Sequence, residues 1–332
     1  MKQGLYLMWA IAATLTLGAC TQASKDDNKD KNPPKDSLAE DRLPVDGNVK
    51  RVYAMGYHFG GVPSTDWKLY EEFRYNDAGQ EIQLESFYDG VGSIMSTQYD
   101  SSGHEILKKL ESSAHAPLIE YRSTWNADHT EQRTEEFAHT ESRVVFKTVR
   151  HLDQAGTELW VEDEDLHAID APISHTLKHV RDAKGRVTED KETFLGKEIV
   201  GTRYSYDAAG NPVKIERMDS EGKLSQTEFF AYDESGRKTT RWFQDHHAYL
   251  NTKQLEARFT YDAQGRLMKE VHYRGACDEA SEQVGKCPIS ETVTYSYDDQ
   301  GRLATEEHLR SGQEPATMKK RFEYFGKVPA GK

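Results

Sequence analysis

Apolar and polar residues alternate along most of the chain after about residue 49, as they do in β-strands. Pairs of aromatic residues stand two positions apart, so both side chains of a pair fall on one face of a strand. The pairs are Phe73/Tyr75, Tyr204/Tyr206, Phe230/Tyr232, Phe259/Tyr261, Tyr295/Tyr297 and Phe322/Tyr324. Lys, Arg, Glu and Thr fill the positions between them. The pattern predicts antiparallel strands with one aromatic face and one solvated face.

A short turn motif separates these strands. Its consensus is Tyr-Asp-x-x-Gly, in which Asp bonds its own backbone at the start of a type I turn and Gly adopts a positive φ. Full copies begin at Tyr88, Tyr99, Tyr206, Tyr232, Tyr261 and Tyr297, and weaker copies begin at Asn76, Asp153, Asp182 and Asp219. Each copy is expected to reverse the chain between two strands.

The spacing of the turn glycines sets the length of the strands. Gly79, Gly92 and Gly103 are 13 and 11 residues apart, which leaves strands of about 7 to 9 residues and about 25 residues per two-strand unit. The interval from Gly265 to Gly301 is longer, at 36 residues. Residues 275–288 are therefore expected to form an insertion at a hairpin tip.

The best-preserved copies resemble the YD repeats of Rhs and wall-associated proteins. They read Tyr232-Asp-Glu-Ser-Gly-Arg237, Tyr261-Asp-Ala-Gln-Gly-Arg266-Leu267 and Tyr297-Asp-Asp-Gln-Gly-Arg302-Leu303. The resemblance covers about residues 73–326 and is eroded between about 110 and 200. In that family the repeats form a spiralling antiparallel sheet that can close into a shell around a toxin domain.

This chain departs from the family because it lacks the plug domains and the self-cleavage core that end such shells. We therefore expect residues 49–328 to form an all-β domain, as an elongated or curled antiparallel sheet of tandem YD-type β-hairpin repeats. A sealed container is the alternative that this departure disfavours.

The first 20 residues have the pattern of a bacterial export signal. Lys2 precedes an apolar run of 13 residues from Leu5 to Leu17, which is too short to span a bilayer as a helix. The run closes in Leu17-Gly18-Ala19-Cys20, which resembles the lipobox of bacterial lipoproteins. We expect residues 1–19 to be removed and Cys20 to be acylated, with palmitate among its acyl chains. An ordinary signal peptide with a chance cysteine is the alternative.

Residues 20–48 are expected to form the acylated anchor and a disordered tether. Lys, Asp and Asn runs and Pro33-Pro34 leave few apolar side chains to bury. Several acyl chains anchor a protein more firmly than one does. Thr21 rather than Asp follows the cysteine, which in enterobacterial lipoproteins allows transport to the outer membrane. We expect the protein on the periplasmic face of that membrane, with the cell surface as the alternative.

Two cysteines remain once Cys20 is acylated. Cys277 and Cys287 lie in the expected insertion, and an exported protein meets oxidising conditions. We predict a structural disulfide between them. A zinc site would need a second Cys/His pair, and a redox centre would have a Cys-x-x-Cys spacing.

The sequence contains no motif for catalysis or cofactor binding. It has no Gly-x-Ser-x-Gly elbow, Walker loop, His-Glu-x-x-His helix or dinucleotide fingerprint. The Asp-x-x-Gly turns offer one carboxylate each, which is too few for calcium. We interpret His246-His247, beside Trp242, as an exposed loop and the acidic run Glu162–Asp165 as a solvated loop. No enzyme, cofactor or metal site is expected.

Charge and aromatic content limit the partners to be expected. The formal net charge of −13 argues against nucleic acid and an anionic membrane face, and it suits a basic protein. We expect a non-enzymatic protein-binding module, in its sharper form an immunity-type protein that captures a secreted toxin. Because aromatic rings can stack on sugars, a glycan- or peptidoglycan-contacting module is the alternative. The protein is expected to contact the membrane through the acyl chains on Cys20.

Overall fold

The computed structural model describes residues 49–56, 58–59, 62–63, 66–87, 92–112, 114, 116–167, 173–194, 196–247, 252–275, 277–283, 285–311 and 317–324. The expected signal peptide (1–19), Cys20 and the tether (20–48) lie outside these residues, as does the turn after Tyr88. The strands all belong to one compact unit, which extends from Pro44 to Lys332.

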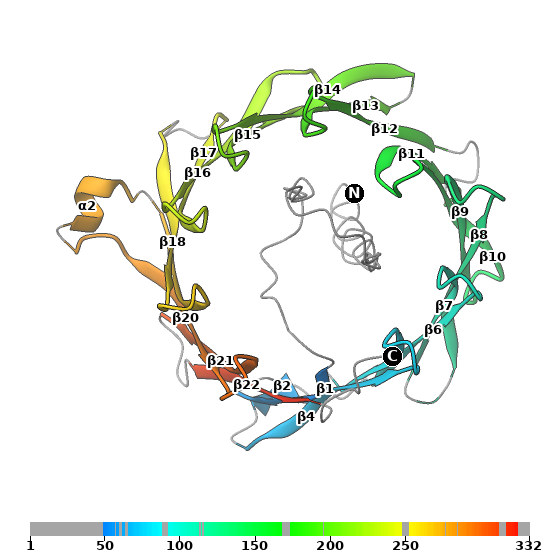
Figure 1. Ribbon diagram of the computed structural model, residues 1–332, viewed down its shortest axis with the longest axis horizontal. Helices are drawn as coiled ribbons and strands as arrows, with labels where there is room; N and C mark the ends of the chain where they lie inside the picture. The colour runs from blue at the N-terminus through cyan, green and yellow to red at the C-terminus, as the bar shows by residue number, and fades with distance from the viewer. Residues whose placement is uncertain are drawn as a thin grey trace, which may run out of the picture. The chain divides into compact units, whose positions relative to one another are not determined.

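Twenty antiparallel strands form a single sheet (Figure 1). They are β1 (Val49–Met55), β4 (Lys68–Tyr75), β5 (Glu81–Ser86), β6 (Ser93–Tyr99), β7 (Glu105–Ser112), β8 (Pro117–Trp125), β9 (Glu131–Ala138), β10 (Arg143–Leu152), β11 (Glu158–Asp165), β12 (Ile173–Arg181), β13 (Val187–Phe194), β14 (Lys197–Tyr206), β15 (Pro212–Met218), β16 (Leu224–Tyr232), β17 (Lys238–Asp245), β18 (Gln254–Tyr261), β19 (Leu267–Tyr273), β20 (Ile289–Tyr297), β21 (Leu303–Arg310) and β22 (Thr317–Tyr324). The short strands β2 (His58–Phe59) and β3 (Val62–Pro63) pair separately.

The sheet is closed into a barrel. From β4 to β22 each strand pairs with the next one in the sequence, and β1 lies between the two ends of this series. Val52 of β1 pairs with Phe322 of β22 on one side and with Glu71 of β4 on the other. Figure 1 shows the resulting ring of strands. The all-β antiparallel fold is as predicted, but the expectation of an elongated or curled sheet that does not close is wrong, because β1 pairs with both end strands and leaves neither with a free edge.

The apolar core follows the aromatic rows. Tyr204 of β14 lies directly opposite Ile215 of β15. Both are buried in a cluster with Val187, and Tyr206 and Phe230 pack against it. Fully burying side chains of this size stabilises a fold by about 1.5–3 kcal/mol each. The alternation seen in the sequence therefore places the core on one face of the sheet.

The turns have the bonds that the Asp-x-x-Gly motif predicts. The Gly265 N–H donates to the Asp262 carbonyl at 3.0 Å, and the Asp262 N–H donates to the Arg266 carbonyl at 2.9 Å. The Asp262 carboxylate also accepts the N–H of Arg266. Gly265 has a φ of +83°, which side-chain-bearing residues rarely adopt. The same two backbone bonds occur in the turns that begin at Asn76, Asp100, Asp153, Asp182, Asp207, Asp219, Asp233 and Asp298.

One turn carries a histidine where the others carry glycine. Between Asn126 and Thr130, His129 has a φ of +55°. A left-handed backbone costs such a residue about 1–2 kcal/mol, and glycine would lose about 0.5–1 kcal/mol more entropy on folding. His129→Gly is therefore expected to raise the free energy of unfolding by about 0.5–1 kcal/mol. Urea titration checks this, and a lower midpoint would contradict it.

Between β19 and β20 the chain leaves the sheet. This segment holds the helix α2 (Glu279–Gln283) and a disulfide between Cys277 and Cys287, whose Cα atoms are 5.2 Å apart. In the described part of the chain, no helix has the length and apolar character needed to cross a bilayer.

Candidate functional site

The position of α2 distinguishes the two faces of the barrel wall. Figure 1 shows α2 outside the ring, and Glu282 of this helix accepts a hydrogen bond from Arg258 of β18 at 2.6 Å. The Arg258 side chain therefore lies on the outer face. Because side chains alternate along a strand, Ala257 and Phe259 lie on the inner face, where both are buried.

Tyrosines of the turn motif connect neighbouring hairpins on this inner face. The Tyr261 hydroxyl donates to the carbonyl of Lys238 at 2.7 Å, two residues after the glycine of the preceding turn, Gly236. The same bond joins Tyr99 to Glu81, Tyr206 to Val187, Tyr232 to Pro212, Tyr297 to Leu267 and Tyr324 to Leu303. Before the turn at Asn126, a tryptophan, Trp125, takes the place of the tyrosine, and its indole N–H donates to the Glu105 carbonyl. The bond therefore recurs with the sequence motif.

Arginines that follow the turn glycines strengthen the same connection. Arg266 bonds the carboxylate of its own turn, Asp262, at 2.6 Å, and its guanidinium lies 4.6 Å from the ring centroid of Tyr297 in the next hairpin. Arg186, Arg237 and Arg302 lie over Tyr206, Tyr261 and Tyr324 in the same way. A cation–π contact thus links these hairpins in addition to the strand pairing.

Replacing Tyr261 by Phe is expected to lower the free energy of unfolding by about 0.5–1.5 kcal/mol. The change leaves the Lys238 carbonyl without its hydroxyl partner but keeps the ring under Arg237. Thermal or urea unfolding measures the loss, and Tyr206→Phe should cost a similar amount because it removes the same bond. Two unchanged midpoints would show that the bond contributes nothing to stability.

A buried polar cluster on the inner face joins four strands, β11 to β14. Asp190 is 5% exposed. It accepts a hydrogen bond from the Tyr204 hydroxyl at 2.7 Å and lies 2.7 Å from Nδ1 of His179. Nε2 of His179 is 3.2 Å from Glu158. The hydrogen bonds to Asp190 and Glu158 raise the pKa of His179 to about 9, so its ring is protonated at neutral pH.

A second histidine cluster lies beside the first. His175 of β12 is 3.9 Å from Asp163 and 3.6 Å from Glu192, and its ion pairs with these carboxylates raise its pKa to about 9. Asp163 also accepts the hydroxyl of Thr148 at 2.8 Å. Asp163 belongs to the acidic run Glu162–Asp165, which forms the end of β11. Our interpretation of this run as a solvated loop is wrong, because partners on both neighbouring strands hold it within the sheet.

Ionised groups continue along the inner face to the closing strands. His308 of β21 is 3.0 Å from Glu291 and also contacts Glu306. Burial lowers the pKa of His308, but its bonds to Glu306 and Glu291 outweigh burial and raise it. Burial raises the pKa of Glu71 on β4. The inner face thus carries several histidine–carboxylate pairs within the wall.

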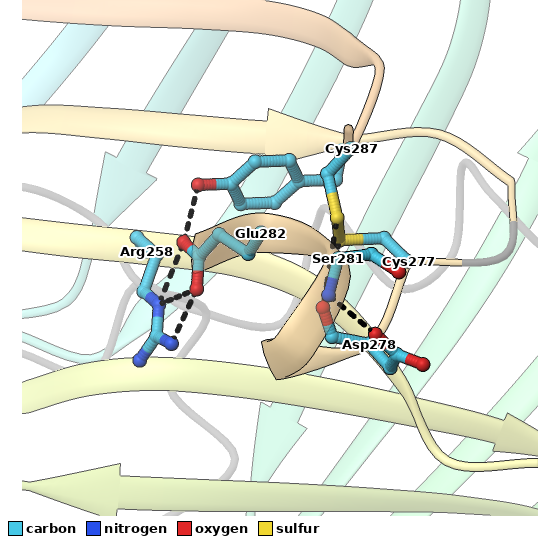
Figure 2. The surroundings of a disulfide bond; sticks show 7 residues. Arg258, Cys277, Asp278, Ser281, Glu282 and Cys287 are labelled. Carbon is cyan, nitrogen blue, oxygen red and sulfur yellow. Dashed lines mark hydrogen bonds and ion pairs between the residues drawn. A yellow bond between two sulfur atoms is a disulfide. The ribbon is translucent and has the colours of Figure 1, made fainter. Parts of the chain in front are cut away.

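The outer face carries the one described helix, and side-chain bonds fix it to the wall. Glu282 of α2 accepts hydrogen bonds from Arg258 and from the Tyr273 hydroxyl, the latter at 2.6 Å (Figure 2). The Leu255 N–H donates to the carbonyl of Cys277 at 2.6 Å. Leu255 and Cys277 are both 1% exposed. The disulfide loop is therefore packed on β18 and does not project freely.

Exposed apolar side chains lie near the edge from which this loop emerges. Ile289 at the start of β20 is 43% exposed, and Leu309 near the end of β21 is 52% exposed. The loop ends at Cys287, two residues before Ile289. The loop and these side chains together form what we term the α2 surface, comprising residues 277–283, Ile289 and Leu309.

The residues singled out in the sequence are placed as follows. Cys20 lies outside the described residues, and Cys277 and Cys287 are bonded to each other. His246, directly after β17, lies 2.9 Å from the Thr227 hydroxyl, and His247 is 59% exposed. Within the described ranges, no group of three or more His, Cys, Asp or Glu side chains is arranged to hold a metal ion.

Two features were missed from the sequence. The Asp190–His179 cluster needs the pairing of β12 with β13, although His175 and His179 do stand four residues apart and hence on one strand face. The contacts of Glu282 carry no sequence signal, because an acidic residue in a short helix is usually solvated.

The fold defines the class of protein as an all-β barrel of twenty antiparallel strands. No protein-family model and no curated protein matches the chain. Similar solved structures include TcdB2-TccC3 without its hypervariable C-terminal region, 13% identical over 75% of this chain and 15% of that one, with a TM-score of 0.28. A porin-like protein from Bacteroides vulgatus is 12% identical over 57% of this chain and all of its own, with a TM-score of 0.30.

A second porin-like protein, from Bacteroides uniformis, is 8% identical over 83% of this chain and 97% of its own, with a TM-score of 0.34. Of TcdB2-TccC3, by contrast, the chain spans only 15% of the length. Scores this low support no conclusion about function.

Proposed function

We propose that the protein is a non-enzymatic, protein-binding lipoprotein of the bacterial outer membrane that binds through the α2 surface. The observation that carries the proposal is the disulfide-closed loop, which is fixed to the outer wall by Glu282 and ends two residues before the exposed Ile289. Leu309, near the end of β21, is exposed as well. Exposed apolar side chains and a fixed loop suit a protein partner, since the loop loses little conformational freedom on binding. The net charge of −13 favours a basic partner.

The repeated unit of the barrel is proposed to be a YD-type β-hairpin. The recurring turn bonds, the tyrosine-to-carbonyl bonds and the arginine–tyrosine contacts support this, because each follows the same motif positions. The resemblance to Rhs proteins is also what suggests immunity-type capture of a toxin as the sharper form of the function.

A capture experiment tests protein binding. A tagged soluble chain that starts after Cys20 is incubated with envelope and secreted fractions, and bound proteins are identified by mass spectrometry. We expect one stoichiometric partner, which is lost from the Ile289→Asp/Leu309→Asp variant. The matched control is Leu159→Asp/Val180→Asp, which alters side chains that are 41% and 36% exposed on β11 and β12. Equal capture by both variants, or no capture at all, would refute the α2 surface as the binding site.

Anchoring through Cys20 is tested separately. We expect the full chain to fractionate with the outer membrane and the Cys20→Ser variant to lose its acyl chains and this location, because stable attachment takes more than one acyl chain. Mass spectrometry of the mature amino terminus provides a direct readout. An unmodified Cys20 would contradict the lipoprotein assignment without bearing on the α2 surface.

The glycan alternative receives less support from the aromatic rows. Tyr206, Tyr232 and Tyr261 use their hydroxyls and rings to connect hairpins. A ring engaged in this way is a structural element of the wall.

A further inference from the structure

A cavity of about 370 Å³ lies on the outer face, between the wall and the disulfide loop. It is lined by Trp242 of β17, by Lys253 just before β18, and by Asp278 and Ala280 of the loop. Its volume falls within the range of about 300–1,000 Å³ that small-molecule sites occupy. It shares Asp278 and Ala280 with the α2 surface, but Ile289 and Leu309, whose substitution tests the proposed protein binding, do not line it.

An aromatic platform and a fixed cation form one side of this cavity. Trp242 pairs directly with Phe229 of β16 on the outer face. The Lys253 ammonium lies 3.9 Å from the ring centroid of Trp242 and 4.8 Å from that of Phe229. Cation–π attraction holds the ammonium in place. In the part of the chain that the structure describes, Lys253 forms no ion pair, so its three N–H groups can serve a ligand.

The disulfide loop contributes a carboxylate of fixed orientation to the lining. Oδ1 of Asp278 accepts the backbone N–H of Ser281 at 2.6 Å, which sets the orientation of the side chain (Figure 2). The same backbone bond lowers the pKa of Asp278, so the group is ionised at neutral pH. The Ser281 side chain also bonds this carboxylate. No cation among the described residues pairs with Asp278, so its negative charge is available to a cationic ligand.

The wall that carries Asp278 is rigid. The Cys277–Cys287 disulfide closes the loop, the Cys277 carbonyl is bonded to β18, and Glu282 is bonded to Arg258. The cation and the carboxylate therefore keep their places when no ligand is present. Such preorganisation lowers the entropy lost on binding.

We propose that this cavity binds a zwitterionic ligand of the size of an amino acid or a dipeptide. Lys253 bonds the ligand carboxylate, Asp278 bonds the ligand ammonium, and the apolar part of the ligand lies against Trp242 and Ala280. Two opposite charges on separate walls match a molecule that carries both charges at its own ends. A neutral sugar would cover the aromatic platform and leave both protein charges without a partner.

The probe is the dipeptide alanyl-alanine, titrated into the soluble chain that starts after Cys20 and followed by calorimetry. Acetyl-alanyl-alanine lacks the ammonium, alanyl-alanine amide lacks the carboxylate, and chitobiose is the neutral sugar control. We expect the free dipeptide to bind and each blocked form to bind at least tenfold more weakly, about the 1.4 kcal/mol that one lost ionic contact represents. Equal binding of the blocked forms, binding of chitobiose alone, or no heat with the free dipeptide would overturn the proposal.

Matched variants locate the site. Lys253→Met keeps the aliphatic stem on Trp242 without the charge, and Asp278→Asn keeps an acceptor for the Ser281 N–H. Each variant is expected to bind the dipeptide at least tenfold more weakly, whereas Lys253→Arg retains binding. Lys223→Met, at a side chain that is 72% exposed, is the control. Unchanged affinity in both charge variants would overturn the site, and because partner capture is measured at Ile289 and Leu309, it would leave the proposed function standing.

Discussion

Replacing Asp190 by alanine is expected to lower the free energy of unfolding by about 3–5 kcal/mol, because it leaves a buried charge without its partner. His179 is protonated, and its side chain is only 6% exposed. In the Asp190→Ala variant, His179 keeps only one carboxylate partner in this cluster, Glu158 at 3.2 Å. The Tyr204 hydroxyl loses its acceptor as well.

Chemical denaturation of the soluble chain measures this loss, and two further variants make the result specific. Glu189→Ala changes the neighbouring carboxylate on the outer face, which pairs with a half-exposed Arg203 at 3.3 Å. It should cost less than about 1 kcal/mol. Asp190→Asn keeps an acceptor for Tyr204, so its loss in the free energy of unfolding should lie between those of Asp190→Ala and Glu189→Ala. Equal losses in all three variants would contradict the importance of the buried pair.

Raising the pH from about 6.5 to about 9 is expected to destabilise the fold. The hydrogen bonds of His179 to Asp190 and Glu158 raise its pKa from 6.5 to about 9, and the ion pairs of His175 with Asp163 and Glu192 do the same for His175. Below pH 6.5 both the folded and the unfolded chain hold these protons, so the stabilisation is complete. Between the two values only the folded chain holds them, so stability falls as the pH rises.

The size of this loss of stability follows from the shift in the pKa of each histidine. At 1.36 kcal/mol per pH unit, each histidine contributes up to about 3 kcal/mol that is lost by about pH 9. Denaturation midpoints at pH 6, 7.5 and 9 measure the slope. His179→Gln should flatten it in part, whereas His247→Gln, at a ring that is 59% exposed, should leave it unchanged. A stability that is constant or rises over this range would contradict protonation of the buried rings.

The strands and turns could be predicted because their signals are local. The Tyr261 motif fixes a turn through bonds within five residues, and aromatic alternation assigns the face of each strand. The run Glu162–Asp165 could not be assigned to a strand in this way, because its four acidic residues show no alternation and its partners Thr148 and His175 lie on other strands.

Closure of the barrel could not be predicted in this way. It depends on β1, which precedes the first turn motif, and on the pairing of Val52 with Phe322, 270 residues away in the sequence. Nothing local to β1 indicates that it pairs on both sides. The disulfide could be predicted because Cys277 and Cys287 are the two cysteines that remain in an exported chain. The meeting of Lys253 and Trp242 with Asp278, by contrast, requires knowledge of where the loop folds back.

The most direct measurement of the closed barrel is the distance between the strands that flank β1. Spin labels at Lys68 of β4 and Lys319 of β22, which pair with Ala54 and Met55 of β1, are separated by two strand spacings, about 10 Å at the backbone. A control pair at Lys319 and Lys178 of β12 spans the ring and should be about 30 Å apart, given a perimeter of twenty strands at about 4.8 Å each. Strong dipolar broadening in the first pair and none in the second is the predicted result. Absence of broadening between Lys68 and Lys319 in a folded chain would contradict closure.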